Sequence, residues 1–289
     1  MPNPVEISIV TVAYNSAEVL PGLLESIPPG IEVVLVDNGP DDGMRDLAQS
    51  RGATVIVPEA NLGFGRGCNL GAARARGTYL FFLNPDARLR PDTLDQLTAA
   101  IDRHPDAAGF GPLQEDETGR CFFKRRSRIR RDIPALPGMA PRVDTRVTVL
   151  SGAALLVPRR AFEKVQGFDP EIFLFYEDDD ISLRLSAQAG PLWLIPTTRV
   201  IHIGGASSPA SPRAARFKGY HWGRSRVYVS RKHQAPRPLL RGLSNALNFL
   251  LSPRSLYSAT HRSEGLGRLA GAWSQRRSDN SPDSTINGP

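Results

Sequence analysis

The sequence predicts an α/β protein with a mainly parallel central sheet, because short apolar strands alternate with helices through its first 110 residues. The strand segments are unbroken runs of branched and aromatic residues, which is typical of strands buried on both faces. Polar residues directly follow three of these runs. Ligands of open parallel α/β sheets bind at the carboxyl ends of the strands, so we expect function at those positions.

The first half of the chain carries the regular part of this pattern. Ser16 is a suitable N-cap for the first helix, Gly77 ends the third, and Pro91 suits the first turn of the fourth. Strands are predicted over residues 7–12, 32–37, 53–57, 78–83 and 107–110. Helices are predicted over 17–26, 42–51, 65–76 and 91–103.

The second half is less regular. Residues 112–146 are basic and rich in proline, and we expect strands and loops of poor order there. The further elements are a strand over 153–157, helices over 158–165 and 178–188, strands over 191–196 and 199–203, and helices over 214–233, 236–251 and 264–274.

The composition is that of a folded protein from a reducing compartment. Of the 289 residues 40% are hydrophobic, which allows a buried core and excludes wholesale disorder. Cys68 and Cys121 are the two cysteines and form no Cys-x-x-Cys, so a disulfide framework is excluded. No leader pattern is visible, and no apolar run approaches the ~18–20 residues of a membrane span. We therefore expect a cytoplasmic protein, with peripheral contact at the inner face of a membrane left open.

The basic charge is unevenly distributed. The net charge is +7, and no acidic residue occurs between Asp180 and Glu264. A basic stretch of this kind is either a solvated face or a surface that attracts phosphate, whether of a nucleotide, a lipid headgroup or a nucleic acid. Charge alone does not choose between these partners.

Three strand ends place polar residues at one edge of the expected sheet. Ala13-Tyr14-Asn15 follows the first strand, Asp37 to Gly43 follows the second, and Asn84-Pro85-Asp86 follows the fourth. Each segment alone is compatible with simple turn chemistry. Together they predict a binding site.

A glycine-rich run, Asn61 to Gly71, enters the third helix. Backbone N–H groups of such a loop can approach a phosphate. The run does not fit Gly-x-Gly-x-x-Gly, which argues against a dinucleotide-binding protein. Close packing of helix on sheet remains the alternative reading.

Four consecutive acids, Glu177 to Asp180, lie at the start of the helix predicted over 178–188. One acid is enough to cap a helix, whereas four repel one another, a cost more often tolerated at functional sites. A carboxylate here can serve as a general base. His202 follows a strand; it is either structural or, with a nearby Asp, part of a metal site.

Taken together, these segments resemble the inverting glycosyltransferases of family 2, particularly the rhamnosyltransferase-like branch, over roughly residues 5–240. The resemblance implies a GT-A nucleotide-diphospho-sugar transferase fold with a helical C-terminal extension. The matching segments are Val10–Asn15, Val36–Gly39, Asn61–Asn69, Phe82–Asp86, Gly167–Asp169, Tyr176–Ile181 and His202 with the glycines that follow it.

The resemblance also implies roles for single residues. Asp178 would be the catalytic base, with Glu177 and Asp180 as supporting acids. A divalent cation, Mg²⁺ or Mn²⁺, would be held by Asp86 and His202. Ser151, Gly152 and Tyr176 would line the acceptor and donor pocket. The residues expected to bind the donor nucleotide are Thr11, Ala13, Tyr14, Asn15, Asp37, Asn38, Asn61, Gly63, Phe64, Gly65, Asn69, Asn84 and Pro85.

The implied domain plan has a catalytic domain over 1–212, divided near 111 into a nucleotide-binding half and an acceptor half. A basic helical extension over 213–275 and a disordered tail over 276–289 would follow. The chain departs from the family pattern at Asn84, where an Asp-x-Asp metal motif usually begins, and at Pro40, where a Ser is common.

The implied reaction moves a hexose or deoxyhexose, best L-rhamnose, from a nucleoside-diphosphate sugar to an acceptor hydroxyl with inversion. The donor would be dTDP-rhamnose or a UDP-sugar, and the acceptor a glycan or a lipid-linked glycan of cell-surface polysaccharide synthesis. Basic and apolar residues over 214–275 suit either helices at a membrane surface or helices packed on the catalytic domain. Three rivals are a non-catalytic nucleic-acid binder that uses this region, a sugar-nucleotide transferase or NAD-dependent epimerase, and a degenerate, inactive nucleotide-sugar binder. The second needs a pyrophosphate fingerprint that the chain lacks, and we expect no nucleic-acid partner.

Overall fold

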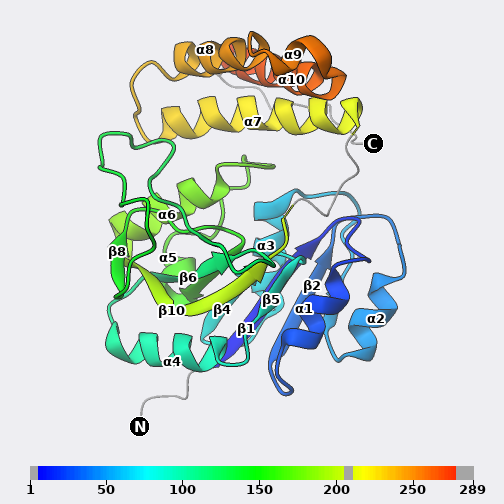
Figure 1. Cartoon of the computed structure of the whole chain (residues 1–289). Helices are drawn as coiled ribbons and strands as arrows, with labels where there is room; N and C mark the ends of the chain where they lie inside the picture. The colour runs from blue at the N-terminus through cyan, green and yellow to red at the C-terminus, as the bar shows by residue number, and fades with distance from the viewer. Residues whose placement is uncertain (1–5, 205–210, 278–289) are drawn as a thin grey trace. The chain divides into compact units, whose positions relative to one another are not determined.

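A computed structural model of the chain describes residues 6–204 and 211–277. The chain divides into two compact units, which we call the sheet unit and the helical unit. The sheet unit is Met1–Glu171 with Glu177–Ser207, and the helical unit is Ile172–Tyr176 with Ser208–Pro289. The chain therefore passes into the helical unit for five residues and returns to the sheet unit at Glu177, the first of the four consecutive acids Glu177–Asp180, which we call the acid cluster. Figure 1 labels most of the helices and strands.

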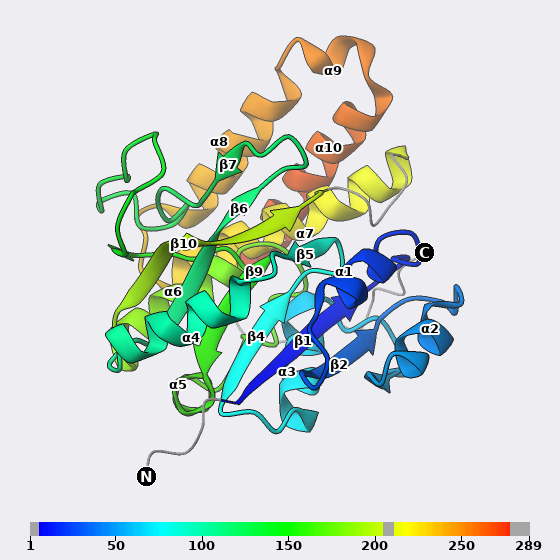
Figure 2. The ribbon, with the colours of Figure 1, turned by 60° about the horizontal axis from the view of Figure 1, so that its bottom comes forward.

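Within the described residues, ten strands form one sheet. Its order is β3-β2-β1-β4-β9-β6-β10-β5, with β7 paired to β6 and β8 to β10. Figure 2 shows β2, β1, β4 and β9 side by side. The strands are β1 (Ile7–Ala13), β2 (Glu32–Asp37), β3 (Thr54–Ile56), β4 (Tyr79–Leu83), β5 (Ala87–Leu89), β6 (Gly109–Glu115), β7 (Cys121–Phe122), β8 (Thr145–Val147), β9 (Ala154–Pro158) and β10 (Leu192–His202).

The N-terminal half of the sheet is parallel, as predicted. β1 pairs in parallel with both β2 and β4, and β2 with β3. β9 is inserted antiparallel between β4 and β6, and β10 runs parallel to β6. The carboxyl ends of β1, β2, β4 and β10 and the amino end of β9 therefore lie at one edge, which we call the C-terminal edge.

Both faces of this sheet are buried, which explains the unbroken apolar strands. Ile9 and Phe81 belong to one hydrophobic core, and their neighbours Val10 and Phe82 to the other. Residues of α1, α2 and α4 complete the first core, and residues of α3, α5 and α6 complete the second. These helices are α1 (Leu20–Ser26), α2 (Met44–Ser50), α3 (Phe64–Arg74), α4 (Thr93–Arg103), α5 (Arg159–Lys164) and α6 (Glu177–Gln188).

One prediction for the second half was wrong. The strands predicted over 191–196 and 199–203 are one strand, β10, whose register shifts between Ile195 and Arg199. Residues 112–146 hold strands and loop, as predicted: they contain β7 and the start of β8, and the loop between them includes the buried Ser127 and Ile129. Ser127 is buried because its hydroxyl donates to the buried carboxylate of Asp179, at 2.6 Å.

The helical unit consists mainly of α7 (Pro212–Lys232), α8 (Pro238–Leu250), α9 (Arg254–Tyr257) and α10 (Ala259–Ser274). α10 begins five residues earlier than predicted, because the Ser258 side chain caps it by accepting from the His261 N–H. Gln275–Arg277 forms a short 3₁₀ turn in place of the predicted disorder, and the rest of the predicted tail, 278–289, lies outside the described residues.

The α7 and α10 backbones are in direct contact at glycines. A Cβ on Gly219 or Gly223 would overlap backbone oxygens of α10, and one on Gly271 would overlap the Tyr220 carbonyl. Since Gly219 and Gly223 are spaced by four residues, they share one face of α7. Only glycine permits this approach of the two helices.

Segment Ile172–Tyr176 is fixed by α7 within the helical unit. Phe173 stacks on His221, and the Ser225 hydroxyl donates to the Leu174 carbonyl at 2.9 Å. Arg226 donates to the Tyr176 hydroxyl at 3.0 Å. Phe175 and Tyr176 both have φ of +68°, a left-handed conformation that costs energy for a non-glycine residue. These contacts hold a strained backbone next to the acid cluster.

Candidate active site

The first part of the site lies where β1 and β2 end. Ala13 and Asp37 are register partners there, and the Asp37 side chain is fully buried. Asp37 Oδ1 accepts from the Gly39 N–H at 2.9 Å, and Oδ2 accepts from Arg45 Nε at 2.6 Å. A Cβ on Gly39 would lie 3.1 Å from the Asn15 nitrogen, so the turns after both strands touch.

Arg45 is a site residue that sequence reasoning missed. It lies in α2, its side chain is 24% exposed, and it also reaches Asp41 at 3.5 Å. The hydrogen bond to Asp37 raises the pKa of the Arg45 guanidinium. The sequence near Arg45 contains Asp41, Asp42 and Asp46, and nothing in it indicates that the partner of Arg45 is Asp37.

The glycine-rich loop is tied to the end of β2. Asn38 Nδ2 donates to the Gly63 carbonyl at 2.8 Å, and Asn38 Oδ1 accepts from the Leu62 N–H at 3.3 Å. Asn61 Oδ1 accepts from the Gly63 N–H at 2.9 Å, and Gly63 has φ of +77°. The loop therefore has one fixed conformation beside Asp37, in which Phe64 begins α3.

Two later glycines of the run serve packing. A Cβ on Gly67 would lie 2.8 Å from a methyl of Val12, and one on Gly71 would press on Val10. Gly65 is buried on the same helix. The packing explanation therefore holds for Gly67 and Gly71, whereas Gly63 shapes the loop.

Asn69 has a structural contact that the sequence did not suggest. Its Nδ2 donates to the Phe168 carbonyl and its Oδ1 accepts from the Phe168 N–H, both at 2.8 Å. Both ends of the amide thus hold the loop that precedes the acid cluster. Its expected contact with a nucleotide stays a prediction.

The second part of the site joins the ends of β4 and β10. His202 Nε2 lies 3.3 Å from Asp86 Oδ1 and 3.3 Å from Asn84 Nδ2. Asp86 Oδ2 accepts from the Gly204 N–H at 3.0 Å, and the Asp86 side chain is 4% exposed. Asn84, Asp86 and His202 therefore meet, although 118 residues separate the first from the last.

This group suits a divalent cation with two protein donors. Neighbouring ligands of an octahedral ion at 2.0–2.1 Å are about 3 Å apart, close to the separation of the Asp86 and His202 donor atoms. The described residues contain no cluster of three or more His, Cys, Asp or Glu suited to a metal. Further ligands would have to come from outside these side chains.

The third part is the acid cluster at the start of α6. Asp178 Oδ2 lies 2.6 Å from Lys124 Nζ and accepts from the Gly152 N–H at 3.3 Å. Asp178 Oδ1 accepts from the Asp179 N–H at 2.9 Å. Burial alone would raise the pKa of Asp178, but Lys124 and these hydrogen bonds outweigh it, so the pKa is lowered. Asp178 is therefore held as an oriented carboxylate.

The other acids of the cluster differ in their surroundings. Asp179, which sequence reasoning did not single out, is buried and accepts from Ser127, the Arg128 N–H and Lys124. Asp180, expected to be a supporting acid, is fully buried and pairs with Arg184 at 2.7 Å. The structure thus places Asp180 in the packed interior and Asp179 beside Lys124.

Glu177 is the acid most affected by burial. Its Oε2 is buried and has no hydrogen-bond partner among the described residues. Burial, followed by the neighbouring charge of Asp178, raises the pKa of Glu177 to about 8. A protonated Glu177 avoids placing another negative charge beside Asp178.

The second and third parts are connected at the amino end of β9. The Asn84 N–H donates to the Ala153 carbonyl at 3.0 Å, and Ala153 follows Gly152. A Cβ on Gly152 would lie 3.2 Å from Asp178 Cβ and 3.6 Å from Phe64. The expected residues Phe64, Asn84, Gly152 and Asp178 therefore share the C-terminal edge. Tyr176 belongs to the helical unit.

The remaining expected residues lie along the same edge. Thr11 is a register partner of Leu83, and its buried hydroxyl has no partner among the described residues. Tyr14 and Asn15 follow β1, with φ of +50° at Asn15, and buried Pro85 lies between Asn84 and Asp86. Ser151 lines a pocket of the sheet unit.

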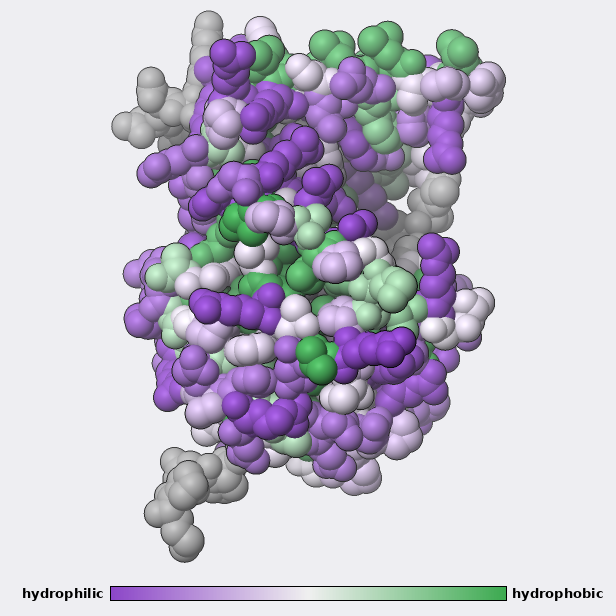
Figure 3. Space-filling view, turned by 60° about the vertical axis from the view of Figure 1, so that its left-hand side comes forward, coloured by the Kyte–Doolittle hydropathy of each residue, from purple (hydrophilic) through white to green (hydrophobic). Residues whose placement is uncertain are grey.

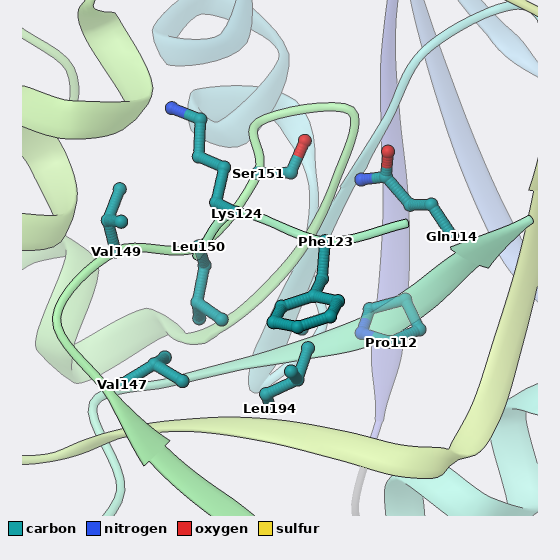
Figure 4. A pocket seen from close by; sticks show the side chains of 10 residues that line it. Pro112, Gln114, Phe123, Lys124, Val147, Val149, Leu150, Ser151 and Leu194 are labelled. Atoms are coloured by element: carbon teal, nitrogen blue, oxygen red, sulfur yellow. The ribbon is translucent and has the colours of Figure 1, made fainter. Parts of the chain in front are cut away.

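This pocket adjoins the acid cluster, is small and is partly open to solvent. Its polar side chains are Gln114, Lys124 and Ser151, and Pro112, Phe123 and Leu150 are among its apolar walls (Figure 4). Lys124 therefore lines the pocket while its ammonium contacts Asp178. Gln114 and Lys124 come from the segment for which sequence reasoning expected little order.

Comparison with known proteins identifies the family of the chain. The model of glycosyl transferase family 2 matches residues 8–166. An N-acetylglucosaminyl-diphospho-decaprenol L-rhamnosyltransferase of Mycobacterium tuberculosis is 32% identical over 300 residues, spanning 88% of this chain and 95% of the relative. The dTDP-rhamnosyl transferase RfbF of Shigella flexneri is 24% identical over 217 residues, spanning 71% of this chain and 72% of its own length.

The fold is shared with solved glycosyltransferases. The crystal structure of GalNAc-T7 with UDP, GalNAc and Mn²⁺ superimposes with a TM-score of 0.65 at 15% identity, covering 96% of this chain and 57% of that one. At this identity the likeness shows the fold alone. The match of the family model and the 32% identical relative show more: the chain belongs to glycosyl transferase family 2 and is a glycosyltransferase with the GT-A fold.

Proposed function

We propose that this glycosyltransferase transfers L-rhamnose from a nucleoside-diphosphate sugar to a hydroxyl of a glycan, with inversion at the anomeric carbon. The observation that carries the proposal is that Asp37, Asp86 and Asp178 all lie along the C-terminal edge of the sheet. Two relatives bear rhamnosyltransferase names, which supports this sugar over other hexoses. The relative named for a diphospho-decaprenol substrate supports a polyprenyl-diphosphate-linked acceptor in cell-surface polysaccharide synthesis.

Asp37 and the turns after β1 and β2 form the nucleotide end of the proposed donor site. Asp37 can accept from the N–H of a pyrimidine, while Arg45 keeps its carboxylate in place. Tyr14, Asn15 and the loop held by Asn38 surround this position. A dTDP or UDP donor fits these acceptor groups.

Asp86 and His202 would hold Mg²⁺ or Mn²⁺ at the diphosphate end of the donor. The bound cation would neutralise the charge that develops on the leaving diphosphate. The Gly204 N–H fixes one oxygen of Asp86 and leaves the other facing His202. Asn84 contributes an amide and no charge to this group. It stands at the position where the Asp-x-Asp metal motif of the wider family usually begins.

Asp178 is the proposed general base. Its carboxylate accepts the proton of the acceptor hydroxyl while that oxygen bonds to the anomeric carbon and the diphosphate leaves with the bonding electrons. A single displacement of this kind inverts the configuration. Positioned bases contribute about 10²–10⁴-fold to the rate.

Replacing the base tests the proposal. Asp178→Asn should lower turnover of dTDP-rhamnose by about 10²–10⁴-fold, because an amide cannot take the proton. Calorimetric binding of dTDP should be unchanged, since the nucleotide end lies at Asp37. Glu117→Gln, at an exposed acid, is the matched control. Wild-type turnover in Asp178→Asn would exclude this residue as the base.

We further propose that the helical unit lies on an anionic membrane surface. Its described main segment, 211–277, contains fourteen Lys and Arg residues and one acid, Glu264. No described helix has the length and apolar character that crossing a bilayer requires. Seven of the eleven exposed large apolar side chains among the described residues lie in this unit: Leu240, Leu247, Leu251, Leu256, Tyr257, Leu266 and Trp273.

The combination of these features favours a lipid surface over nucleic acid. Figure 3 shows apolar residues in green interspersed among hydrophilic ones in purple at the top of the view, where α8 to α10 lie. Apolar side chains can enter the headgroup region while arginines contact lipid phosphates. Leu251, Leu256 and Tyr257, which are 82%, 76% and 78% exposed, would make the deepest contacts.

Vesicle sedimentation tests this second proposal. The protein should bind vesicles that contain anionic lipid at low salt and lose binding as NaCl is raised. The triple variant Leu251→Ser, Leu256→Ser, Tyr257→Ser should bind vesicles at least tenfold more weakly than wild type. The double variant Met139→Ser, Val143→Ser is the matched control, because these two side chains are similarly exposed in the sheet unit. Binding to nucleic acid but not to vesicles would contradict the proposal.

A further inference from the structure

Lys124 occupies a special position in the acid cluster. Its Nζ lies 2.6 Å from Asp178 Oδ2 and 3.0 Å from Asp179 Oδ2, and its side chain is 21% exposed. It follows β7 and lines the pocket of Figure 4, so it also borders open space. One ammonium group therefore joins the proposed base to a second carboxylate.

Asp179 does not require Lys124 for all of its hydrogen bonds. Its Oδ1 accepts from the Ser127 hydroxyl at 2.6 Å and from the Arg128 N–H at 2.7 Å. The Ser127 oxygen in turn accepts from the N–H groups of Ile129 and Arg130, which fixes this turn. Asp179 is thus anchored independently, and the shorter contact of Lys124 is with Asp178.

We propose that Lys124 is a positioning residue that orients Asp178 and keeps it ionised until the acceptor arrives, with Asp179 as the counter-ion that keeps Lys124 in place. This inference rests on the proposed role of Asp178 as the base. When the acceptor proton moves to Asp178, that carboxyl group becomes neutral. The ammonium of Lys124 then remains balanced by the charge of Asp179, so it has no need to move or to lose a proton.

The charged groups around Asp178 give this arrangement a definite pH signature. Lys124, Glu177 and Asp179 surround it within the sheet unit, and Cys68 lies near Glu177. Lys124 lowers the pKa of Asp178, so removing Lys124 should raise that pKa. Removing the charge of Asp179 should lower the pKa further, because Lys124 would then pair with Asp178 alone. The two substitutions therefore predict shifts of opposite sign.

The test is the pH profile of kcat/KM for dTDP-rhamnose. Lys124→Met should move the acidic limb up by at least one pH unit, and Lys124→Arg should keep it near the wild-type position. Asp179→Asn should move the limb down, because Lys124 would then pair with Asp178 alone. The amide oxygen of the new side chain can still accept from Ser127, so the turn should be retained. Ser127→Ala is the matched control: it removes hydrogen bonds with Asp179, Ile129 and Arg130 but no contact with Lys124 or Asp178, so it should leave the limb in place.

The outcomes separate this inference from the proposed function. An unchanged acidic limb in Lys124→Met, with only a lower melting temperature, would assign Lys124 a structural role and overturn the inference. If Lys124→Met does not fold, a limb that fails to move down in Asp179→Asn overturns it equally. Wild-type activity in Asp178→Asn would instead reject the proposed base itself, whatever the Lys124 variants show.

Discussion

Individual charged residues of the site differ in whether the fold gives them a partner. Asp37 and Asp180 are buried but ion-paired, with Arg45 and Arg184. Glu177 has a buried oxygen without a hydrogen-bond partner among the described residues, and burial, followed by the charge of Asp178, raises its pKa. Burial of an acid without a cation favours its neutral form. The structure therefore gives Asp37 and Asp180 a cationic partner and leaves Glu177 as the acid whose neutral form is favoured.

The raised pKa of Glu177 makes stability depend on pH. Between its ordinary value of 4.5 and about 8, the folded protein keeps a proton that the unfolded chain loses, so stability falls as pH rises through this range. Glu177→Gln removes this dependence. The variant should gain stability relative to wild type as the pH rises from 5 to 8, because wild type loses up to roughly 1.4 kcal/mol per pH unit over this range by keeping the proton and the variant does not. Urea unfolding at both pH values measures this; an equal difference at the two pH values would contradict it.

The pair Asp86 and His202 predicts a specific metal requirement. Asp86→Ala or His202→Ala should remove most of the stimulation of turnover by Mn²⁺, because each deletes one of two protein donors. The concentration of Mn²⁺ for half-maximal activity should rise at least tenfold. His104→Ala, at the end of α4 beside Trp193, is the control. Unchanged Mn²⁺ dependence in both site variants would place the cation elsewhere.

Close approach between elements depends on glycine in both units. α3 packs on β1 through Gly67 and Gly71, and α7 packs on α10 through glycines on both helices. The first contact positions the helix that begins at the glycine-rich loop. The second forms the core of the unit that holds segment Ile172–Tyr176. The first contact therefore helps to orient the site, and the second stabilises the helical unit.

A single methyl group should disturb either contact. Gly71→Ala would press on Val10, and Gly271→Ala would overlap the Tyr220 carbonyl. Each should cost about 1–3 kcal/mol, as overpacking typically does. Gly138→Ala, where an added Cβ would meet nothing closer than 4.0 Å, is the matched control. Thermal unfolding measures the difference; a melting temperature equal to that of the control would show that the helices can separate without cost.

Across the whole molecule, the sequence predicted what depends on local pattern. Strands β1, β2 and β4 were recognisable as apolar runs, and their parallel pairing places Asp37 and Asp86 at one edge. The antiparallel insertion of β9 was not recognisable, because strand order depends on contacts between distant segments.

Lys124 was missed for a similar reason. It lies in a basic, proline-rich segment without periodicity, and its partners Asp178 and Asp179 are more than fifty residues away in the chain. Arg45 was missed because nothing in a short helix indicates which acid an arginine will meet. Local sequence thus identifies the acids of the site, and the folded chain is needed to identify the cations that hold them.

The most direct test of the central claim is a crystal structure with dTDP-rhamnose and Mn²⁺, collected at a wavelength where manganese scatters anomalously. The account predicts the pyrimidine against Asp37, an anomalous peak within 2.5 Å of both Asp86 and His202, a distance characteristic of direct ligation, and the anomeric carbon facing Asp178. A nucleotide bound away from the C-terminal edge, or a manganese peak that contacts neither residue, would contradict it.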